Sequence, residues 1–305
     1  MEGIYAYADL IKVYKAILDS AQEIANYLRY DSTNKISTQN VFGDLQNEMD
    51  IKADNVIFSH LKKSGVVYAA MSEEKPFLNE LNSEGDYVVT FDPIDGGSII
   101  DANFAVASIF AIWNKKDING STGRDVVGAA LAIYGSRTTM LLYNTHNQHV
   151  EELTLIKMGL KERWIVTNPD LKIANKAKIF SPEGVRACYD NPAYLRIFEH
   201  YCKAGYSIRY SGGMACDCYQ MFIKGQGIYC SIDSVAHPAK LRLLYECIPI
   251  AFLVEAAGGK TTNGDKSILD IVIDGYQQKS AIICGSSEEV GFVNQNLKGE
   301  GELTQ

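Results

Sequence analysis

The stretch VVTFDPIDGGSIIDANF, residues 88–104, contains the pattern that decides the expected fold and site of this chain. Its apolar start predicts a buried strand, and the strand leads into two aspartates, Asp92 and Asp95, separated by a proline and an isoleucine. We expect Pro93 to tighten a turn that brings both carboxylates to one place. Residues 96–98, Gly-Gly-Ser, let a ligand approach the backbone closely, and we expect a helix after them whose N-terminus favours an anion. On its own, however, the motif is more typical of a plain turn.

The composition limits the classes of partner. The chain has 305 residues, of which 47% are hydrophobic, enough for one large core or two domains. Its formal net charge of -8 argues against broad nucleic-acid binding, which needs a basic surface. No apolar stretch approaches the roughly 20 residues of a membrane span. We therefore expect neither nucleic acid nor a membrane as a partner.

The cysteines and the N-terminus indicate a compartment. All seven cysteines lie in the C-terminal part of the chain, from Cys188 onward, and an odd number favours reduced thiols. The first residues show neither the basic flank nor the apolar core of a secretion signal. We therefore expect a cytoplasmic protein.

Hydrophobic periodicity predicts alternating helices and strands. In the first half we expect helices over 5–30 and 50–63 and a sheet from strands near 65–74, 84–95, 103–113, 125–135 and 138–144. After an irregular connection near 157–175 we expect helices over 193–204, 214–223 and 240–257 and a strand near 208–210. The fold class is therefore α/β (α+β layered), with alternating helix and sheet layers in two domains, residues 1–175 and 176–305.

Acidic residues recur at the ends of these elements. They are Asp50 and Asp54 on the second helix, Glu73 and Glu74 after the first strand, Asp92 and Asp95 after the next, and Glu246 on the last helix. Acids at strand ends in a layered α/β protein converge on the ligand-binding crevice, and Mg²⁺ is the natural counter-ion for such a group. Taken singly, the Glu73-Glu74 pair is more typical of a solvated loop, and Glu246 of an ion pair with Arg242 one turn earlier.

The whole set favours a phosphoryl-transfer site, because metal ligands stand next to a glycine-rich turn suited to phosphate. The chain has no Gly-x-Ser-x-Gly elbow and no P-loop motif. Hydrolysis by a metal-activated water is the chemistry that remains.

Four stretches occur in a fixed order: FGDLQNEMDIKAD, MSEE, FDPIDGGSIIDANF and KLRLLYEC. In this order they resemble the fructose-1,6-bisphosphatase family of sugar bisphosphatases, over about residues 40–285. The resemblance implies that family's fold and metal-dependent hydrolysis of a sugar bisphosphate. It also implies two or three Mg²⁺ ions in each active site, with Mn²⁺ as an alternative.

The resemblance further implies roles for individual residues. The metal ligands would be Glu73, Glu74, Asp92, Asp95, Glu246 and the carbonyl of Ile94. Asp54 would help Glu74 to deprotonate the attacking water, and Asp50 would lie near this network. The cleaved phosphate would be held by backbone amides of Gly96, Gly97 and Ser98. The far phosphate would be bound by Arg209, Tyr210 and Lys240, with Arg186 as a further candidate, and Gly213 and Met214 would line the sugar.

Within the family, the resemblance is greatest to the members that act on sedoheptulose 1,7-bisphosphate, through IFSPEGVRACYDNPAY, YGSRTT and IRYSGGM. Arg186 and Ser231 are the positions that separate this branch from the enzymes that act on fructose 1,6-bisphosphate. The alternatives are a fructose-1,6-bisphosphatase, an enzyme that serves both sugars, and a non-catalytic sugar-phosphate sensor. In the family the residue equivalent to Arg209 reaches into a neighbouring subunit, which implies a homodimer or homotetramer.

Overall fold

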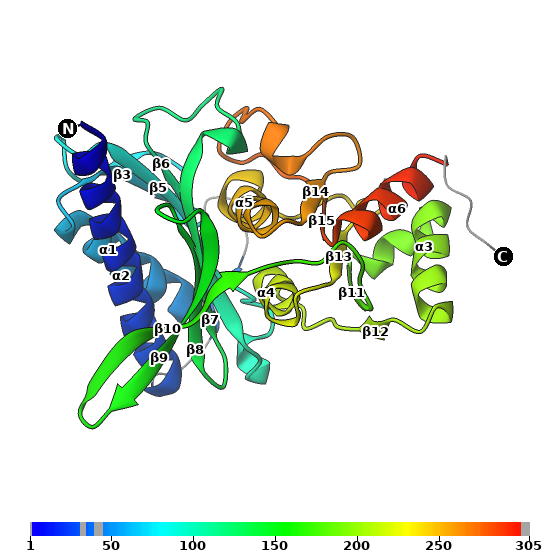
Figure 1. Ribbon diagram of the computed structural model, residues 1–305, viewed down its shortest axis with the longest axis horizontal. Coiled ribbons are helices and arrows are strands. Elements are labelled where there is room, and N and C mark those ends of the chain that lie inside the picture. Colours follow the sequence, from blue (N-terminus) through cyan, green and yellow to red (C-terminus); the bar gives the residue numbers. More distant parts are fainter. Residues whose placement is uncertain (1, 31–34, 40–44, 300–305) are drawn as a thin grey trace.

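The computed structural model describes residues 2–30, 35–39 and 45–299 of the chain. Residues 42–44, the start of the FGDLQNEMDIKAD stretch, lie outside the described residues. Helices and sheets alternate in five layers along the long axis of the molecule (Figure 1). The predicted alternation of helix and sheet layers is therefore confirmed.

The helices form three of these layers. Helices α1 (Glu2–Tyr30) and α2 (Glu48–Lys63) pack side by side on the outer face of the first sheet (Figure 1). Helices α4 (Met214–Lys224) and α5 (Ile248–Ala256) lie between the two large sheets. Helices α3 (Pro192–Lys203) and α6 (Ser287–Leu297) cover the far side of the second sheet.

The first large sheet has eight strands in the order β10-β9-β8-β7-β6-β5-β3-β4. All neighbouring strands are antiparallel except β3 and β5, which are parallel. The bounds are β3 (Val67–Ser72), β4 (Asn79–Glu80), β5 (Tyr87–Asp95), β6 (Val106–Trp113), β7 (Val126–Tyr134), β8 (Thr138–Asn144), β9 (His149–Met158) and β10 (Lys161–Leu171).

The second large sheet has five strands in the order β12-β11-β13-β15-β14. Its first three members run parallel, and β15 is antiparallel to both of its neighbours. The bounds are β11 (Ile179–Glu183), β12 (Ser207–Ile208), β13 (Ile228–Ser231), β14 (Lys260–Thr262) and β15 (Ile282–Gly285). A separate hairpin pairs β1 (Lys35–Gln39) with β2 (Leu45–Asn47).

Two apolar cores enclose the first sheet. Val13, Ile17 and Ile24 recur at spacings of four and seven along α1, so they share one helix face, and they are fully buried against the sheet. On the opposite face, α4 and α5 pack between the sheets, and α5 is buried along most of its length. These cores fix the strand ends from which the acidic residues project.

The quoted stretch folds differently from the predicted turn. Strand β5 continues through Pro93 to Asp95, with a β-bulge where the register shifts against β6. Proline is tolerated in a strand at such a bulge, because the ladder is already interrupted there. The turn begins only at Gly96. The prediction of a helix after Ser98 was wrong, because Ile100–Ala102 forms only a single 3-10 turn.

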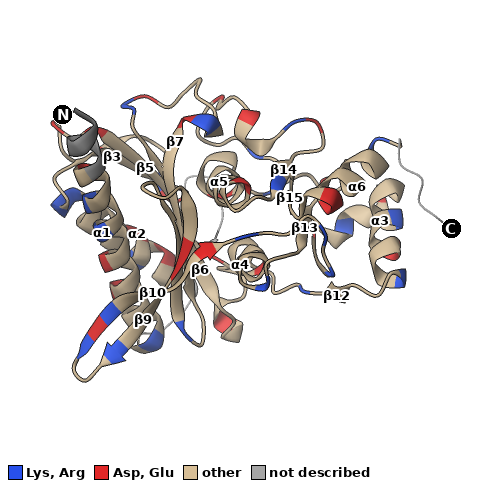
Figure 2. Ribbon diagram, viewed as in Figure 1, with Lys and Arg blue, Asp and Glu red and all other residues tan. Residues whose placement is uncertain are grey.

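Two further predictions were wrong. The irregular connection expected near 157–175 contains strand β10, an exposed edge strand that begins with the charged residues Lys161, Glu162 and Arg163 (Figure 2). The helix expected from Lys240 begins only at Leu243, as a π-helical turn over Leu243–Cys247. Arg242 is extended and bridges to Lys279, so the chain cannot enter the helix earlier.

The predicted division at residue 175 falls between β10 and β11, in the connection between the two large sheets. It stays a prediction. Within the described part of the chain, no helix is both long and apolar enough to span a membrane.

Candidate active site

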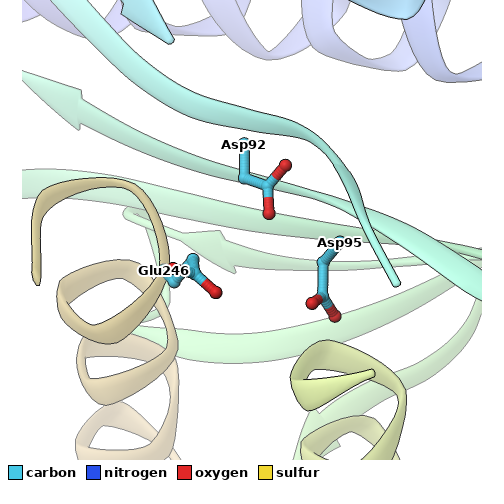
Figure 3. A group of neighbouring side chains, drawn as sticks. All are labelled: Asp92, Asp95 and Glu246. Atoms are coloured by element: carbon cyan, nitrogen blue, oxygen red, sulfur yellow. The ribbon is translucent and has the colours of Figure 1, made fainter. Parts of the chain in front are cut away.

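Three buried carboxylates meet between the two sheets. Asp92, Asp95 and Glu246 each offer an oxygen atom, and these atoms all lie within 4.8 Å of one another. Figure 3 shows the two aspartates on one strand and the glutamate on the facing helical turn. Residues 154 positions apart in the sequence therefore form one acidic group, as the spacing of acids predicted.

The β-bulge in β5 is the reason that both aspartates face this point. Residues three apart on a regular strand project to opposite faces of the sheet. Here Asp92 pairs with Ile109 and Asp95 with Ala107, so three steps on β5 correspond to two on β6. The extra residue returns Asp95 to the face of Asp92. Within the bulge, the Ile94 amide donates to Asp92 Oδ1 at 3.0 Å.

Glu246 is placed by the π-helical turn. The amides of Glu246 and Cys247 both donate to the carbonyl of Arg242 at 3.1 Å, which widens the helix by one residue. Pro249 follows in the first turn of α5, where its missing amide hydrogen is tolerated. The Arg242 backbone amide also donates to the Glu246 carboxylate. Glu246 therefore contacts the main chain of Arg242, which differs from the ion pair considered from spacing.

Backbone amides surround Asp95. The amide of Ala215, in the first turn of α4, donates to Asp95 Oδ2 at 2.7 Å, and those of Met214 and Gly96 also face the carboxylate. A side chain at position 213 would lie 3.5 Å from Asp95 Oδ2 and 3.6 Å from the Gly96 Cα. The predicted sugar-lining residues Gly213 and Met214 therefore lie next to the acidic group.

Burial and mutual repulsion oppose the ionised forms of this group. Burial raises the pKa of Asp92 well above its ordinary value, and the charges of Glu73, Glu246 and Asp95 raise it further. Burial also raises the pKa of Glu246 well above its ordinary value, and the charge of Glu73 raises it further. For Asp95, burial raises the pKa to about 6, although the amides of α4 counteract it. Clustered oxygen ligands with unbalanced negative charge fit a divalent cation such as Mg²⁺.

Two other predicted acids act on this group, and a third follows one of them in the chain. Glu73 follows β3 and lies 3.4 Å from the side chain of buried Arg242, measured from Oε1 to Nε. Asp50, on α2, is close enough for its charge to raise the pKa of Asp92. Glu74 follows Glu73 and is half-buried. Among the described residues, only Asp92, Asp95 and Glu246 form a group whose possible ligand atoms all lie within 4.8 Å of one another.

Asp54 has a different environment. It is buried, and its Oδ2 lies 2.6 Å from the ammonium of Lys75. Burial raises the pKa of Asp54, while hydrogen bonds from Lys75 and then Ser72 lower it. Among the described residues, none of the acids Asp92, Asp95 and Glu246 shifts the pKa of Asp54. Of the two predicted acids on α2, Asp50 is therefore the one that faces the group.

The turn predicted to hold a phosphate directly follows the acidic group. Gly96 has a φ of 97°, in the left-handed region, and a side chain there would lie 3.2 Å from Val106 Cγ1. Only glycine is comfortable under both conditions. The Ile99 amide closes the turn by donating to the Gly96 carbonyl at 2.9 Å. Gly97 is half-buried and Ser98 is exposed, so the outer part of the turn is accessible.

The predicted far-phosphate residues form a second group on the second sheet. Tyr210 is close enough to Arg186 and Glu183 for their charges to shift its pKa, and Lys240 is close enough to shift that of Glu183. Arg209 is exposed, and its Nη1 donates to the neighbouring Ile208 carbonyl at 3.0 Å. The structure therefore associates Arg186, Tyr210 and Lys240, whereas Arg209 follows β12 and donates to the main chain of its neighbour.

Sequence reasoning missed three residues at this site. Glu183 ends strand β11, and the charges of Asp95 and Lys240 both shift its pKa, but Pro182 before it hid this strand in the sequence. Arg242 was considered only as a partner for Glu246, although it contacts Glu73. Lys75 directly follows the acidic pair, and no pattern in the sequence linked it to Asp54.

Comparison with known families gives two matches that together span most of the chain. Residues 5–168 match the family described as "Fructose-1-6-bisphosphatase, N-terminal domain". Residues 173–298 match "Fructose-1-6-bisphosphatase, C-terminal domain".

Individual proteins of two kinds are similar to this chain. A chloroplastic sedoheptulose-1,7-bisphosphatase of Triticum aestivum is 37% identical over 97% of this chain and 75% of its own length. A class 1 fructose-1,6-bisphosphatase of Syntrophotalea carbinolica is 33% identical over 96% of this chain and 91% of its own length.

Solved structures show the same two kinds. A provisionally named sedoheptulose-1,7 bisphosphatase from Toxoplasma gondii superposes with a TM-score of 0.88, at 36% identity, over 96% of this chain and 94% of that one. Fructose-1,6-bisphosphatase of Leishmania major superposes with a TM-score of 0.87, at 30% identity, over 95% of this chain and 94% of that one.

Proposed function

Because this chain belongs to the fructose-1,6-bisphosphatase family of sugar bisphosphatases, we propose that it hydrolyses the 1-phosphate of sedoheptulose 1,7-bisphosphate. The products are sedoheptulose 7-phosphate and inorganic phosphate. The observation that carries this proposal is the buried group of Asp92, Asp95 and Glu246 directly beside the glycine turn at residues 96–98.

The proposed cofactor is Mg²⁺, with two or three ions in each site and Mn²⁺ as a substitute. Its ligands are the carboxylates of Glu73, Glu74, Asp92, Asp95 and Glu246 and the carbonyl of Ile94. The raised pKa values of Asp92 and Glu246 support a cation at this place, because burial and like charge otherwise oppose their ionised forms. When bound, the metal lowers the pKa of a water molecule and offsets the negative charge of the phosphate.

The residues of the chain bind the phosphate and remove a proton. Backbone amides of Gly96, Gly97 and Ser98 hold the phosphate that is cleaved. Glu74, Asp50 and Asp54 are the candidate acceptors for the proton of the attacking water. We favour Asp50 on α2, because it faces Asp92, whereas Asp54 is paired with Lys75.

The far phosphate binds to the second sheet. Lys240, Arg186 and Tyr210 follow strands β13, β11 and β12 there, and cationic groups complement the charge of that phosphate. The sugar lies between the two phosphate sites, along Gly213 and Met214 at the start of α4. The separation of the two sites sets the length of substrate that fits.

Sequence relatives support the seven-carbon substrate, because plant proteins named sedoheptulose-1,7-bisphosphatase are 36–37% identical to this chain. Arg186 and Ser231 support it as well, since the resemblance places the difference between the two branches at these positions. The second candidate function is fructose 1,6-bisphosphate hydrolysis, alone or in addition. It is favoured by the relatives of that name at 32–33% identity.

The test is phosphate release from the two sugars, measured side by side in the presence of Mg²⁺. We expect a kcat/KM that is at least roughly tenfold higher for sedoheptulose 1,7-bisphosphate. An equal or opposite preference would reject the seven-carbon assignment and leave the phosphatase chemistry in place.

The assembly we propose is a homodimer or homotetramer. Arg209 supports this assembly. Its side chain is exposed, and within the described part of the chain the hydrogen bond that it makes is to the carbonyl of the neighbouring Ile208. In a dimer its side chain completes the far-phosphate site of the neighbouring subunit. Light scattering of the purified protein gives the assembly mass, and a monomer that is fully active would contradict the proposal.

We also propose a cytoplasmic location. All seven cysteines are free thiols in the structure, and reduced thiols are typical of the cytosol.

A further inference from the structure

The carboxyl ends of β11 and β13 define the far side of the site. These strands are parallel, and their last residues, Glu183 and Ser231, are paired in register. Ligands bind at the carboxyl ends of parallel strands, where successive loops converge. Arg186 follows β11 and Lys240 follows β13, so the two proposed far-phosphate cations leave the sheet at this same edge. Glu183, the last residue of β11, is a carboxylate at the edge that these cations follow.

The side chain of Glu183 is held by hydroxyl donors. The hydroxyl of Tyr229 donates to Glu183 Oε2, and the hydroxyl of Ser231 faces the same carboxylate. The Tyr194 hydroxyl donates to the Glu183 carbonyl at 2.9 Å, which fixes the main chain. The protein groups that donate hydrogen bonds to this carboxylate are therefore hydroxyls.

The charges that act on Glu183 come from both proposed sites. Burial, then the charge of Asp95, raise the pKa of Glu183 to about 7, and Lys240 opposes that rise. Asp95 belongs to the acidic group and Lys240 to the far-phosphate group. Since one member of each group shifts the pKa of this half-buried carboxylate, and since Glu183 ends β11 at the edge where Arg186 and Lys240 follow, it borders the space that the sugar spans in the proposed function.

We propose that Glu183 is a specificity residue that accepts hydrogen bonds from the sugar hydroxyls between the two phosphates. A carboxylate repels phosphate. A carboxylate beside two phosphate sites is therefore expected to bind a different part of the ligand, one that donates hydrogen bonds. A carboxylate has about four lone-pair sites, and the protein hydroxyls leave acceptor capacity on Glu183. A polyhydroxylated sugar supplies such donors, whereas a simple phosphate ester does not. This inference rests on the proposed function of the site.

Another glutamate that is hydrogen-bonded to a tyrosine provides a matched control. Glu152, on β9, accepts from the Tyr219 hydroxyl as Glu183 does from Tyr229, and Thr167 donates to it as well. It lies on the first sheet, away from the proposed substrate residues. Glu152→Gln therefore removes the same charge from the same kind of tyrosine pair without altering the site.

The first experiment measures binding of the products without metal. The protein in EDTA is titrated calorimetrically with sedoheptulose 7-phosphate, with fructose 6-phosphate and with inorganic phosphate. We expect Glu183→Gln to weaken both sugar phosphates by at least roughly tenfold, since hydrogen bonds to a charged acceptor are the stronger ones. Inorganic phosphate should bind the variant as it binds the wild type, and Glu152→Gln should bind all three ligands normally.

The second experiment compares two substrates in the presence of Mg²⁺. Glu183→Gln should raise the KM for the sugar bisphosphate by at least roughly tenfold. Its kcat/KM for p-nitrophenyl phosphate, which has no sugar hydroxyls, should stay at the wild-type value. Equal losses on both substrates would instead identify Glu183 as part of the metal site and overturn the inference.

The outcomes separate this inference from the proposed function. Unchanged sugar-phosphate affinity in Glu183→Gln, with wild-type activity intact, would reject the role of Glu183 alone. An equal loss in Glu152→Gln would show a general effect of removing a buried charge and would also reject it. Absence of phosphate release from any sugar bisphosphate by the wild type would reject the proposed function itself.

Discussion

The backbone amide of Ala215 donates a hydrogen bond to Oδ2 of Asp95 at 2.7 Å. The two residues are 120 positions apart, at the start of α4 and the end of β5. The acidic group is therefore assembled by both halves of the chain, because β5 supplies the aspartates while α4 and the π-helical turn orient or complete them. A shift of α4 relative to the first sheet would change the environment of Asp95 directly.

Removal of one carboxylate should stabilise the metal-free protein. In Asp92→Asn, one of several mutually repelling buried charges disappears. We expect the free energy of unfolding in EDTA to rise by about 1–2 kcal/mol, a melting temperature higher by roughly 2–6 °C. Thermal unfolding in EDTA and in Mg²⁺ measures both states, and the variant should lose the stabilisation that Mg²⁺ gives the wild type.

Asp125→Asn is the control for this experiment. Its carboxylate lies 2.7 Å from Lys115, and that contact lowers the pKa of Asp125. Neutralising Asp125 should leave stability unchanged or slightly lower. A metal-free Asp92→Asn variant that is less stable than the wild type would contradict the repulsive group.

The two aspartates of α2 should differ in their contribution to turnover. Asp50 faces the acidic group, so Asp50→Asn should lower kcat by roughly 10²–10⁴, as expected for loss of a proton acceptor. Asp54→Asn should lower kcat less, because Asp54 is engaged by Lys75. Steady-state phosphate release by both variants decides the order, and a larger loss in Asp54→Asn would reverse the assignment.

The Lys75–Asp54 pair should contribute to stability. Lys75→Met leaves the carboxylate of Asp54 buried without its cation, at a cost of about 2–3 kcal/mol. This figure lies below that for a fully buried pair, because the Lys75 side chain is 38% exposed and water screens it. Denaturant unfolding measures the change, and adding Asp54→Asn should recover most of it. Additive losses in the double variant would show that the pair does not interact.

The sequence predicted the elements with strong periodicity. Helices α1 and α2 and strands β3, β5, β6, β7 and β8 follow apolar patterns that the cores enforce, so they were predicted within a few residues. Strand β10 was missed because it is an edge strand with charged residues exposed along it. The π-helical turn was missed because the apolar run after Lys240 is equally compatible with a regular helix.

The candidate site was likewise predicted only in part from the sequence. The pattern of acids predicted that Asp92, Asp95 and Glu246 would meet, and they do. Spacing alone could not reveal the β-bulge that turns both aspartates to one side, because it depends on the register with β6. Nor could it show that Lys75 pairs with Asp54, since that contact requires α2 to pack beside the loop after β3.

The ionisation of Glu183 predicts a pH-dependent stability difference. Burial raises its pKa in the folded protein from the ordinary 4.5 to about 7. The folded state therefore favours the protonated form, and this stabilisation is present below about pH 4.5 and lost as the pH rises through about 7. Glu183→Gln cannot ionise, so it should be as stable as the wild type in acid and more stable in base.

The difference should reach the order of 2–3 kcal/mol between about pH 4.5 and about pH 8, in metal-free protein. Denaturant unfolding of both proteins at each pH measures it. A difference that is constant with pH would show that Glu183 ionises at its ordinary value, and a difference of opposite sign would show that a cation stabilises its charged form.

In the proposed function, Asp92, Asp95 and Glu246 form a divalent-metal site at which a sugar bisphosphate is hydrolysed. The most direct test measures phosphate release from sedoheptulose 1,7-bisphosphate by the wild type and by Asp92→Asn, each in Mg²⁺ and in EDTA. We expect release only by the wild type in Mg²⁺, with a loss of at least roughly 10³-fold in the variant. Equal release in EDTA, or an Asp92→Asn variant as active as the wild type, would contradict a metal-dependent role for this group.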